Sequence, residues 1–221
     1  HNVLLECKRY KRIYMRPAYT AITKQTDNPF LNMYKMDAVD RNGKTFGYYF
    51  ATRKNDGELA CQTSATSPDG AVIYAVTECP SDRIVLIKQY RYPLDRYIYE
   101  LPAGLIEPGE TIAMTASREL KEETGLTFRE YEGGLEAFRR AFFQAQGLCD
   151  ESNALTFGYA SGEISDKKPE ASEAIEPVLA DKREALRILQ EEELSIRCAY
   201  MLMQFVNSDP EKPFAFLNPS L

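Results

Sequence analysis

Residues 104–126 read GLIEPGETIAMTASRELKEETGL, the most regular pattern in the chain. Helical spacing begins near Thr111, and Gly125 is typical of the residue that ends a helix. On a helical wheel with about 100° per residue, three carboxylates fall within an arc of about 100°. These are Glu119, Glu122 and Glu123. The adjoining arc is apolar, so we expect the acidic cluster to border the buried face of the helix.

Three clustered carboxylates need a counter-charge, because like charges at positions i and i+3 or i+4 destabilise a helix. Arg118 can pair with Glu122 at i+4, but one guanidinium cannot neutralise three carboxylates. A hard divalent cation can, since it prefers carboxylate and carbonyl oxygens as ligands. The pattern therefore indicates Mg²⁺, with Mn²⁺ as a substitute. The adjacent pair Glu122-Glu123, taken alone, is typical of a solvated helix.

The spacing of the whole segment is more specific than the glutamates alone. It reads G-x5-E-x7-R-E-U-x-E-E-x-G-U, where U is a bulky aliphatic residue. A chance match in a chain of this length has a probability below roughly one in a million. The segment resembles the signature of Nudix hydrolases at every defined position. The resemblance implies an α/β fold, a Nudix-type α/β/α sandwich with a mixed β-sheet, together with an N-terminal antiparallel β-hairpin region.

The resemblance also implies roles for residues of the motif. Members of this family cleave a nucleoside diphosphate linked to another group by attack of water at phosphorus. Glu119 and Glu123 are implied to bind the metal directly. Glu122 is implied either to bind the metal directly or to contact one of its direct ligands. Glu122 is also a candidate catalytic residue, and the backbone carbonyl of Ala103 a further metal ligand. Arg118 is implied to organise the glutamates and Glu110 to support Arg118. The supporting motif positions are Gly104, Glu110, Arg118 and Gly125.

The flanking sequence resembles the ADP-ribose pyrophosphatase branch of this MutT-like family. The resemblance rests on QYRYP at residues 89–93 and ELPAG at residues 100–104. It implies a nucleoside diphosphate sugar as substrate, first of all ADP-ribose, and a homodimer formed through the N-terminal region, where the base is recognised. Arg91 and Arg96 are candidate substrate-binding residues, with a surface position on a strand as the alternative for each.

In this branch the general base usually comes from a late acidic loop, which here is PEASEAIEP at residues 169–177. By its spacing Glu173 is the first candidate for the catalytic base and Glu170 the second. A loop that is simply solvated is the alternative for both. Burial and nearby metal can shift the pKa of either carboxyl in either direction, so the sequence leaves the choice between them open.

One position departs from the branch. Phe142 stands where ADP-ribose hydrolases usually have a proline, which leaves other nucleotide sugars, such as GDP-mannose or UDP-glucose, as alternative substrates. A non-catalytic Nudix-fold sensor of nucleotide sugars is a further alternative. A MutT-like triphosphate hydrolase is disfavoured by the long N-terminal extension.

Composition excludes several other classes of protein. The 221 residues contain 27 Lys and Arg against 33 Asp and Glu, a net charge of −6 that argues against nucleic-acid binding. His1 is the single histidine, so internal catalytic triads and zinc sites built on histidine are excluded. The five cysteines form no C-x-x-C pair, and no apolar run approaches the roughly 18 residues of a membrane span. We expect a cytoplasmic protein with no membrane partner.

The segments divide into three parts. We expect an N-terminal arm and β-hairpin over residues 1–65, the Nudix domain over 66–210 and a C-terminal tail over 211–221. Asn42-Gly43 predicts a type I′ turn within the hairpin. Strands are expected near 71–77, 83–90, 97–101, 135–143, 153–160 and 175–179, helices near 111–125, 182–190 and 192–206, and an end to regular structure at Asp209-Pro210.

Overall fold

The computed structural model describes residues 16–64, 67–78, 80–165 and 174–219. The chain forms two compact units. Unit 1 comprises His1–Ala65 and Ala145–Glu151, and unit 2 comprises Thr66–Gln144 and Ser152–Leu221. The sequence-based boundaries after residues 65 and 210 stay predictions, but the inclusion of Ala145–Glu151 in unit 1 was not foreseen.

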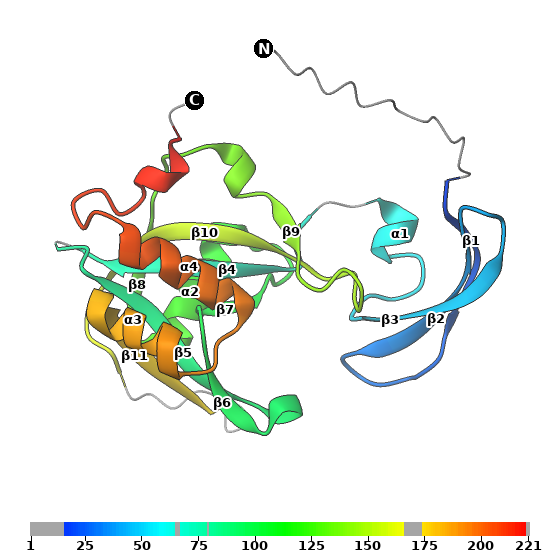
Figure 1. Ribbon diagram of the computed structural model, residues 1–221, viewed down its shortest axis with the longest axis horizontal. Helices are drawn as coiled ribbons and strands as arrows, with labels where there is room; N and C mark the ends of the chain where they lie inside the picture. Colours follow the sequence, from blue (N-terminus) through cyan, green and yellow to red (C-terminus); the bar gives the residue numbers. More distant parts are fainter. Residues whose placement is uncertain (1–15, 65–66, 79, 166–173, 220–221) are drawn as a thin grey trace, which may run out of the picture. The chain divides into compact units, whose positions relative to one another are not determined.

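Unit 2 is built on an eight-stranded mixed sheet (Figure 1). Its central order is β11-β5-β4-β10-β8, with β6 paired to β5, β7 to β4 and β9 to β10. Only β10 and β4 run parallel among the pairs of this sheet that the described residues form. The strands are β4 (Gly70–Thr77), β5 (Arg83–Arg91), β6 (Arg96–Glu100), β7 (Ala103–Leu105), β8 (Thr127–Glu130), β9 (Ala141–Phe143), β10 (Ser152–Ser161) and β11 (Ile175–Asp181).

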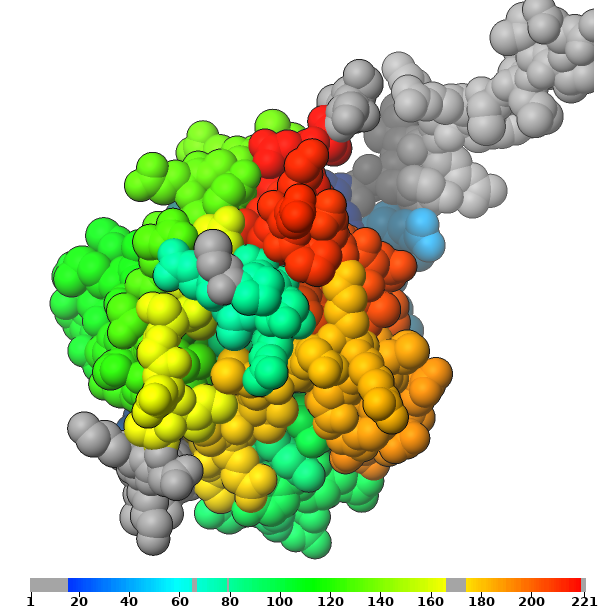
Figure 2. All heavy atoms as spheres, turned by 90° about the vertical axis from the view of Figure 1, so that its left-hand side faces the viewer, coloured from blue at the N-terminus to red at the C-terminus, as the bar shows by residue number. Residues whose placement is uncertain are grey.

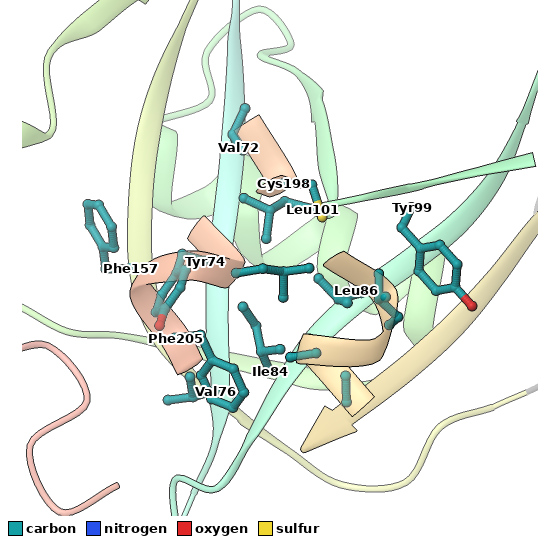
Figure 3. Close-up of a cluster of buried hydrophobic side chains, with 14 of the residues drawn as sticks. Val72, Tyr74, Val76, Ile84, Leu86, Tyr99, Leu101, Phe157, Cys198 and Phe205 are labelled. Atoms are coloured by element: carbon teal, nitrogen blue, oxygen red, sulfur yellow. The ribbon is translucent and has the colours of Figure 1, made fainter. Parts of the chain in front are cut away.

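Helices cover both faces of this sheet. The helices are α2 (Ile112–Thr124), α3 (Lys182–Glu191) and α4 (Ile196–Asn207), with short 3-10 helices η1 (Tyr92–Leu94), η2 (Glu136–Phe138) and η3 (Ala215–Leu217). One core cluster joins Tyr74 and Leu86 of the sheet to Cys198 and Phe205 of α4 (Figure 3). A second cluster joins Val85 of β5 to Ala116 and Leu120 of α2. The predicted α/β/α sandwich with a mixed sheet is confirmed.

Helix α2 forms where its spacing predicts it. The hydroxyl of Thr111 accepts a hydrogen bond from the Met114 amide at 3.3 Å, which caps the first turn. Gly125 ends the helix with a φ of +79°, a conformation that a side chain would strain. Ala116 and Leu120 are fully buried, as expected of the apolar arc. The glutamates of the adjoining arc therefore lie along the edge of the helix–sheet interface.

Unit 1 contains a three-stranded antiparallel sheet of β1 (Ala18–Lys24), β2 (Asn32–Val39) and β3 (Thr45–Thr52), followed by the short helix α1 (Ala60–Thr63). The predicted hairpin is therefore present and extended by β1. Its turn type was predicted wrongly, because Gly43 has a φ of +82° but Asn42 does not have a positive φ. The amide of Gly43 donates to the carbonyl of Asp40 at 3.0 Å, and the Asp40 carboxylate accepts from the amides of Asn42 and Lys44. These bonds stabilise a three-residue loop with glycine in the left-handed region.

The C-terminal segment of unit 2 is packed onto the sheet. The prediction that regular structure ends at Asp209-Pro210 is wrong, because η3 follows. The side chains of Phe214 and Leu217 are buried in the main core cluster. The amide of Leu135 donates to the carbonyl of Leu217 at 3.0 Å. Figure 2 shows this segment, in red, lying beside a yellow-green part of the chain. Burial of two apolar side chains thus attaches this segment to the core, in addition to the turn hydrogen bonds within the segment.

We predict that Phe214→Ala lowers the free energy of unfolding by about 3–5 kcal/mol, since it removes a buried aromatic ring that contacts Tyr74 and Tyr131. Urea unfolding followed by circular dichroism measures this change. The exposed neighbour Glu211→Ala is the control and should change stability by less than about 0.5 kcal/mol. Equal stability of Phe214→Ala and wild type would show that the segment is a dispensable tail.

No helix in the described part of the chain is both long and apolar enough to cross a bilayer.

Candidate active site

Strand β7 places a glycine, Gly104, directly against a glutamate of α2, Glu119. A Cβ atom on Gly104 would lie 1.7 Å from Oε1 and 1.9 Å from Cδ of Glu119. No side chain can occupy position 104 while Glu119 keeps its place. The absence of a side chain at the first motif position thus lets the carboxylate of α2 approach the backbone of β7, next to Ala103.

Arg118 lies at the centre of the acidic residues. Its Nη1 donates to Glu119 Oε1 at 2.8 Å and to Glu122 Oε2 at 3.2 Å. Its Nε and Nη2 donate to the two carboxylate oxygens of Glu110, each at 2.9 Å. Nη2 also donates to the carbonyl of Leu105 at 3.1 Å. One guanidinium thus ties the β7–α2 loop to two of the three glutamates, beyond the expected contact with Glu122.

Glu110 is held as a carboxylate by this arrangement. Besides the fork from Arg118, it accepts from the hydroxyl of Thr115 at 2.7 Å and from the amide of Glu107 at 3.1 Å. The hydrogen bonds from Arg118, then the one from Thr115, lower the pKa of Glu110 from 4.5 to about 2. The hydrogen bonds of Arg118 to Glu110 and to Glu119 raise the pKa of Arg118. Both groups are therefore charged at neutral pH, and the loop is anchored to the helix by a bidentate ion pair.

We predict that this ion pair makes the protein less stable in acid. A pKa that is lower in the folded than in the unfolded state contributes stability that is complete above pH 4.5 and lost as the pH falls towards 2. The melting temperatures of wild type and Glu110→Gln should differ at pH 7 and converge near pH 2. The exposed Glu191→Gln on α3 serves as the control. A difference between wild type and Glu110→Gln that is independent of pH would contradict the prediction.

The three glutamates of α2 differ in exposure. The side chain of Glu119 is 15% exposed and that of Glu122 is 60% exposed, while Glu123 is half-buried. Among the described residues no three acidic or cysteine side chains surround a single point as in a finished metal site. Glu119 and Glu122 nevertheless contact the same nitrogen of Arg118. All the atoms that could bind a metal here are oxygens. The chemistry of this donor set, together with the packing of Glu119 on Gly104, fits a hard divalent cation.

Arg91 and Arg96 are brought together on the β5–β6 hairpin, where they are directly paired across the strands. Arg91 forms an ion pair with the buried carboxylate of Glu100, and Arg96 donates to Glu193 at 2.7 Å. Both guanidinium groups are partly exposed. Sequence reasoning missed Glu100 and Glu193, because the pairing of distant charges depends on strand register and leaves no local signal.

Two predicted features have a different outcome. Glu170 and Glu173 lie outside the residues that the structure describes, so the position of the general base stays a prediction. Phe142 lies on β9, opposite Asn153 of β10, and its ring is 5.4 Å from the Arg140 guanidinium. The residue that departs from the branch pattern is thus a partly exposed strand residue of unit 2.

Comparison with known sequences gives related proteins. A family model described as NUDIX domain matches residues 67–200. An ADP-ribose pyrophosphatase of Bacillus subtilis is 29% identical over 140 residues, which cover 63% of this chain and 72% of that protein. A putative nudix hydrolase 2 of Caenorhabditis elegans is 37% identical over 122 residues, 52% of this chain and 53% of the relative. An ADP-sugar pyrophosphatase of Mus musculus is 34% identical over 145 residues, 59% of this chain and 64% of the relative.

Among solved structures, the crystal structure of an ADP compounds hydrolase resembles this chain with a TM-score of 0.64 and 17% sequence identity. The superposition covers 86% of this chain and 94% of the other. The structural likeness therefore extends over more of the chain than the sequence matches do, and it shows a shared fold.

Proposed function

This chain belongs to the Nudix hydrolase family, in its ADP-ribose pyrophosphatase-like branch, and we propose that it hydrolyses the diphosphate of a nucleoside diphosphate sugar. ADP-ribose is the first candidate substrate. Water would attack one phosphorus, the phosphoanhydride P–O bond would break, and the products would be AMP and ribose 5-phosphate. The relatives that hydrolyse ADP-ribose or ADP-sugars support this choice over GDP-mannose and UDP-glucose.

The observation that carries the proposal is the arrangement of Gly104, Arg118 and Glu119. In this arrangement the carboxylates of Glu119 and Glu122 accept hydrogen bonds from one nitrogen of Arg118, and the edge of α2 keeps an excess of acidic side chains. We propose that Glu119, Glu123 and the Ala103 carbonyl hold Mg²⁺, with Mn²⁺ as a substitute, and that Glu122 assists. When bound, such an ion offsets the negative charge of a diphosphate and makes water a better nucleophile.

The remaining residues would bind the substrate and move a proton. Arg91 and Arg96 carry positive charge at the end of the β5–β6 hairpin and would bind phosphate oxygens. Glu173, or Glu170 in its place, would accept the proton that the attacking water loses. Arg118 would keep Glu119 and Glu122 oriented and would not contact the substrate.

Substrate class is tested by incubating the protein and Mg²⁺ with ADP-ribose, ADP-glucose, GDP-mannose, UDP-glucose, dinucleotide polyphosphates and nucleoside triphosphates. We expect the highest kcat/KM with ADP-ribose and equal amounts of AMP and ribose 5-phosphate. Preference for a nucleoside triphosphate would contradict the proposed branch. Calorimetric binding of a nucleotide sugar without any product would show a sensor in place of an enzyme.

We also propose that the protein is a homodimer formed through unit 1. Several large apolar side chains of β2 and β3 are exposed on this unit, which is typical of an interface. They include Met33, Phe46, Tyr48 and Tyr49. Sedimentation equilibrium should give twice the mass of the 25.2 kDa chain, and a monomeric mass at all concentrations would contradict the proposal.

A further inference from the structure

The β5–β6 hairpin carries a buried carboxylate that the proposed reaction leaves unexplained. Glu100 ends β6, and its side chain is 5% exposed. The guanidinium of Arg91 donates to its Oε1 through Nε, and Nη2 of Arg197 on α4 lies 3.9 Å from its Oε2. Removing a carboxylate from water is costly unless charged partners compensate, and here two guanidinium groups do so. The buried carboxylate of Glu100 therefore restrains the side chain of Arg91.

The alternation of side chains along β5 gives the orientation of Arg91. Successive side chains of a strand point to opposite faces of the sheet. Arg91 therefore shares a face with Val85, which lies six residues earlier on β5. Val85 packs in one cluster with Ala116 and Leu120 of α2. The arginine held by Glu100 thus belongs to the same face of the sheet as the helix that carries the glutamates.

The neighbouring arginine is held much less firmly. Arg96 pairs with Arg91 across the hairpin, but its carboxylate partner Glu193 is 58% exposed. Ion pairs between exposed groups contribute little to stability or to rigidity, because water and salt screen them. Of the two arginines, only Arg91 is bound to a carboxylate shielded from solvent, although its own guanidinium is 43% exposed.

We propose that Glu100 is a positioning residue, which fixes Arg91 through Nε so that its terminal nitrogens are directed at the substrate diphosphate. The inference rests on the proposed function. An arginine anchored at Nε presents the planar fork of its two terminal nitrogens, which matches phosphate oxygens. Because the carboxylate holds the side chain in place before binding, less conformational entropy is lost when the substrate arrives. The main effect of Glu100 is then on KM.

A double-mutant cycle tests this proposal. The kcat and KM for ADP-ribose with Mg²⁺ are measured for wild type, Arg91→Ala, Glu100→Gln and the double variant. We expect each single change to raise KM about tenfold, the effect of losing one charged hydrogen bond, with a smaller change in kcat. If Glu100 acts through Arg91, the KM of the double variant equals that of Arg91→Ala alone. Glu78→Gln breaks the exposed ion pair with Arg129 and is the matched control, with KM and kcat unchanged.

Thermal unfolding of each variant separates positioning from folding. If Glu100→Gln does not fold, Arg91→Lys decides, since it keeps the charge but lacks the fork and Nε; a wild-type KM for Arg91→Lys would overturn the proposal. KM effects that multiply in the double variant, or a loss of melting temperature in Glu100→Gln with unchanged KM, would overturn it as well. Absence of turnover by the wild type with every nucleotide sugar would instead remove the proposed function, and this inference with it.

Discussion

Glu123→Gln is expected to reduce kcat by about 1,000-fold or more while leaving the fold intact. The substitution replaces a charged oxygen by a neutral amide at the border of the buried face of α2, so it changes the affinity for a divalent cation far more than the packing. Hydrolysis of ADP-ribose at increasing Mg²⁺ concentration measures the effect. Circular dichroism should show a melting temperature close to that of the wild type.

The control for this change is Glu191→Gln. Like Glu123, Glu191 is next to another glutamate near the end of its helix, but it lies on the exposed face of α3. The activity of Glu191→Gln should equal that of the wild type. If Glu123→Gln kept wild-type turnover at every Mg²⁺ concentration, Glu123 would not be a metal ligand. If the activity of Glu123→Gln recovered in part at high Mg²⁺ concentration, the carboxylate of Glu123 would mainly determine the affinity for the ion and not its position.

Helix α2 was predictable because its signals are local. The Thr111 cap, the apolar arc of Ala116 and Leu120 and the left-handed Gly125 each act within a few residues of the chain. The same holds for the strands β4, β5, β10 and β11, whose apolar runs the sequence displays directly. The motif also selected the residues that gather around Arg118. Local propensity and the global fold agree in this part of the molecule.

Other features depend on contacts between distant residues and were missed or only partly foreseen. Strand β1 reads as an irregular arm, because its pairing with β2 and the packing of Ile22 on the unit 1 core leave no local signal. Phe214 falls in the predicted C-terminal tail, and its role is apparent only from the core that it fills. The ion pair of Arg91 with Glu100 depends on the register of β5 and β6, which apolar patterns alone do not specify. The bidentate contact of Arg118 with Glu110 likewise depends on how the loop before α2 folds back.

Gly104→Ala is expected to reduce kcat/KM for ADP-ribose about 100-fold. The added methyl group would overlap the Glu119 carboxylate, whose Oε1 lies 1.7 Å from the ideal Cβ position, so the carboxylate must move. A displacement of about 1 Å in a catalytic group is enough for a loss of this size. Position 104 does not require a positive φ, and the fold of β7 should therefore tolerate alanine.

The loss should act through Glu119, and a double variant tests this. Because Gly104→Ala displaces the carboxylate that Glu119→Gln neutralises, the double variant should be no less active than Glu119→Gln alone. Gly147→Ala is the matched control, since nothing lies within 4 Å of its ideal Cβ and its φ is not positive. Wild-type activity in Gly104→Ala would mean that Glu119 can leave Gly104 without consequence. The contact between β7 and α2 would then be a feature of packing alone, and the catalytic role of this carboxylate would have to be assigned elsewhere on α2.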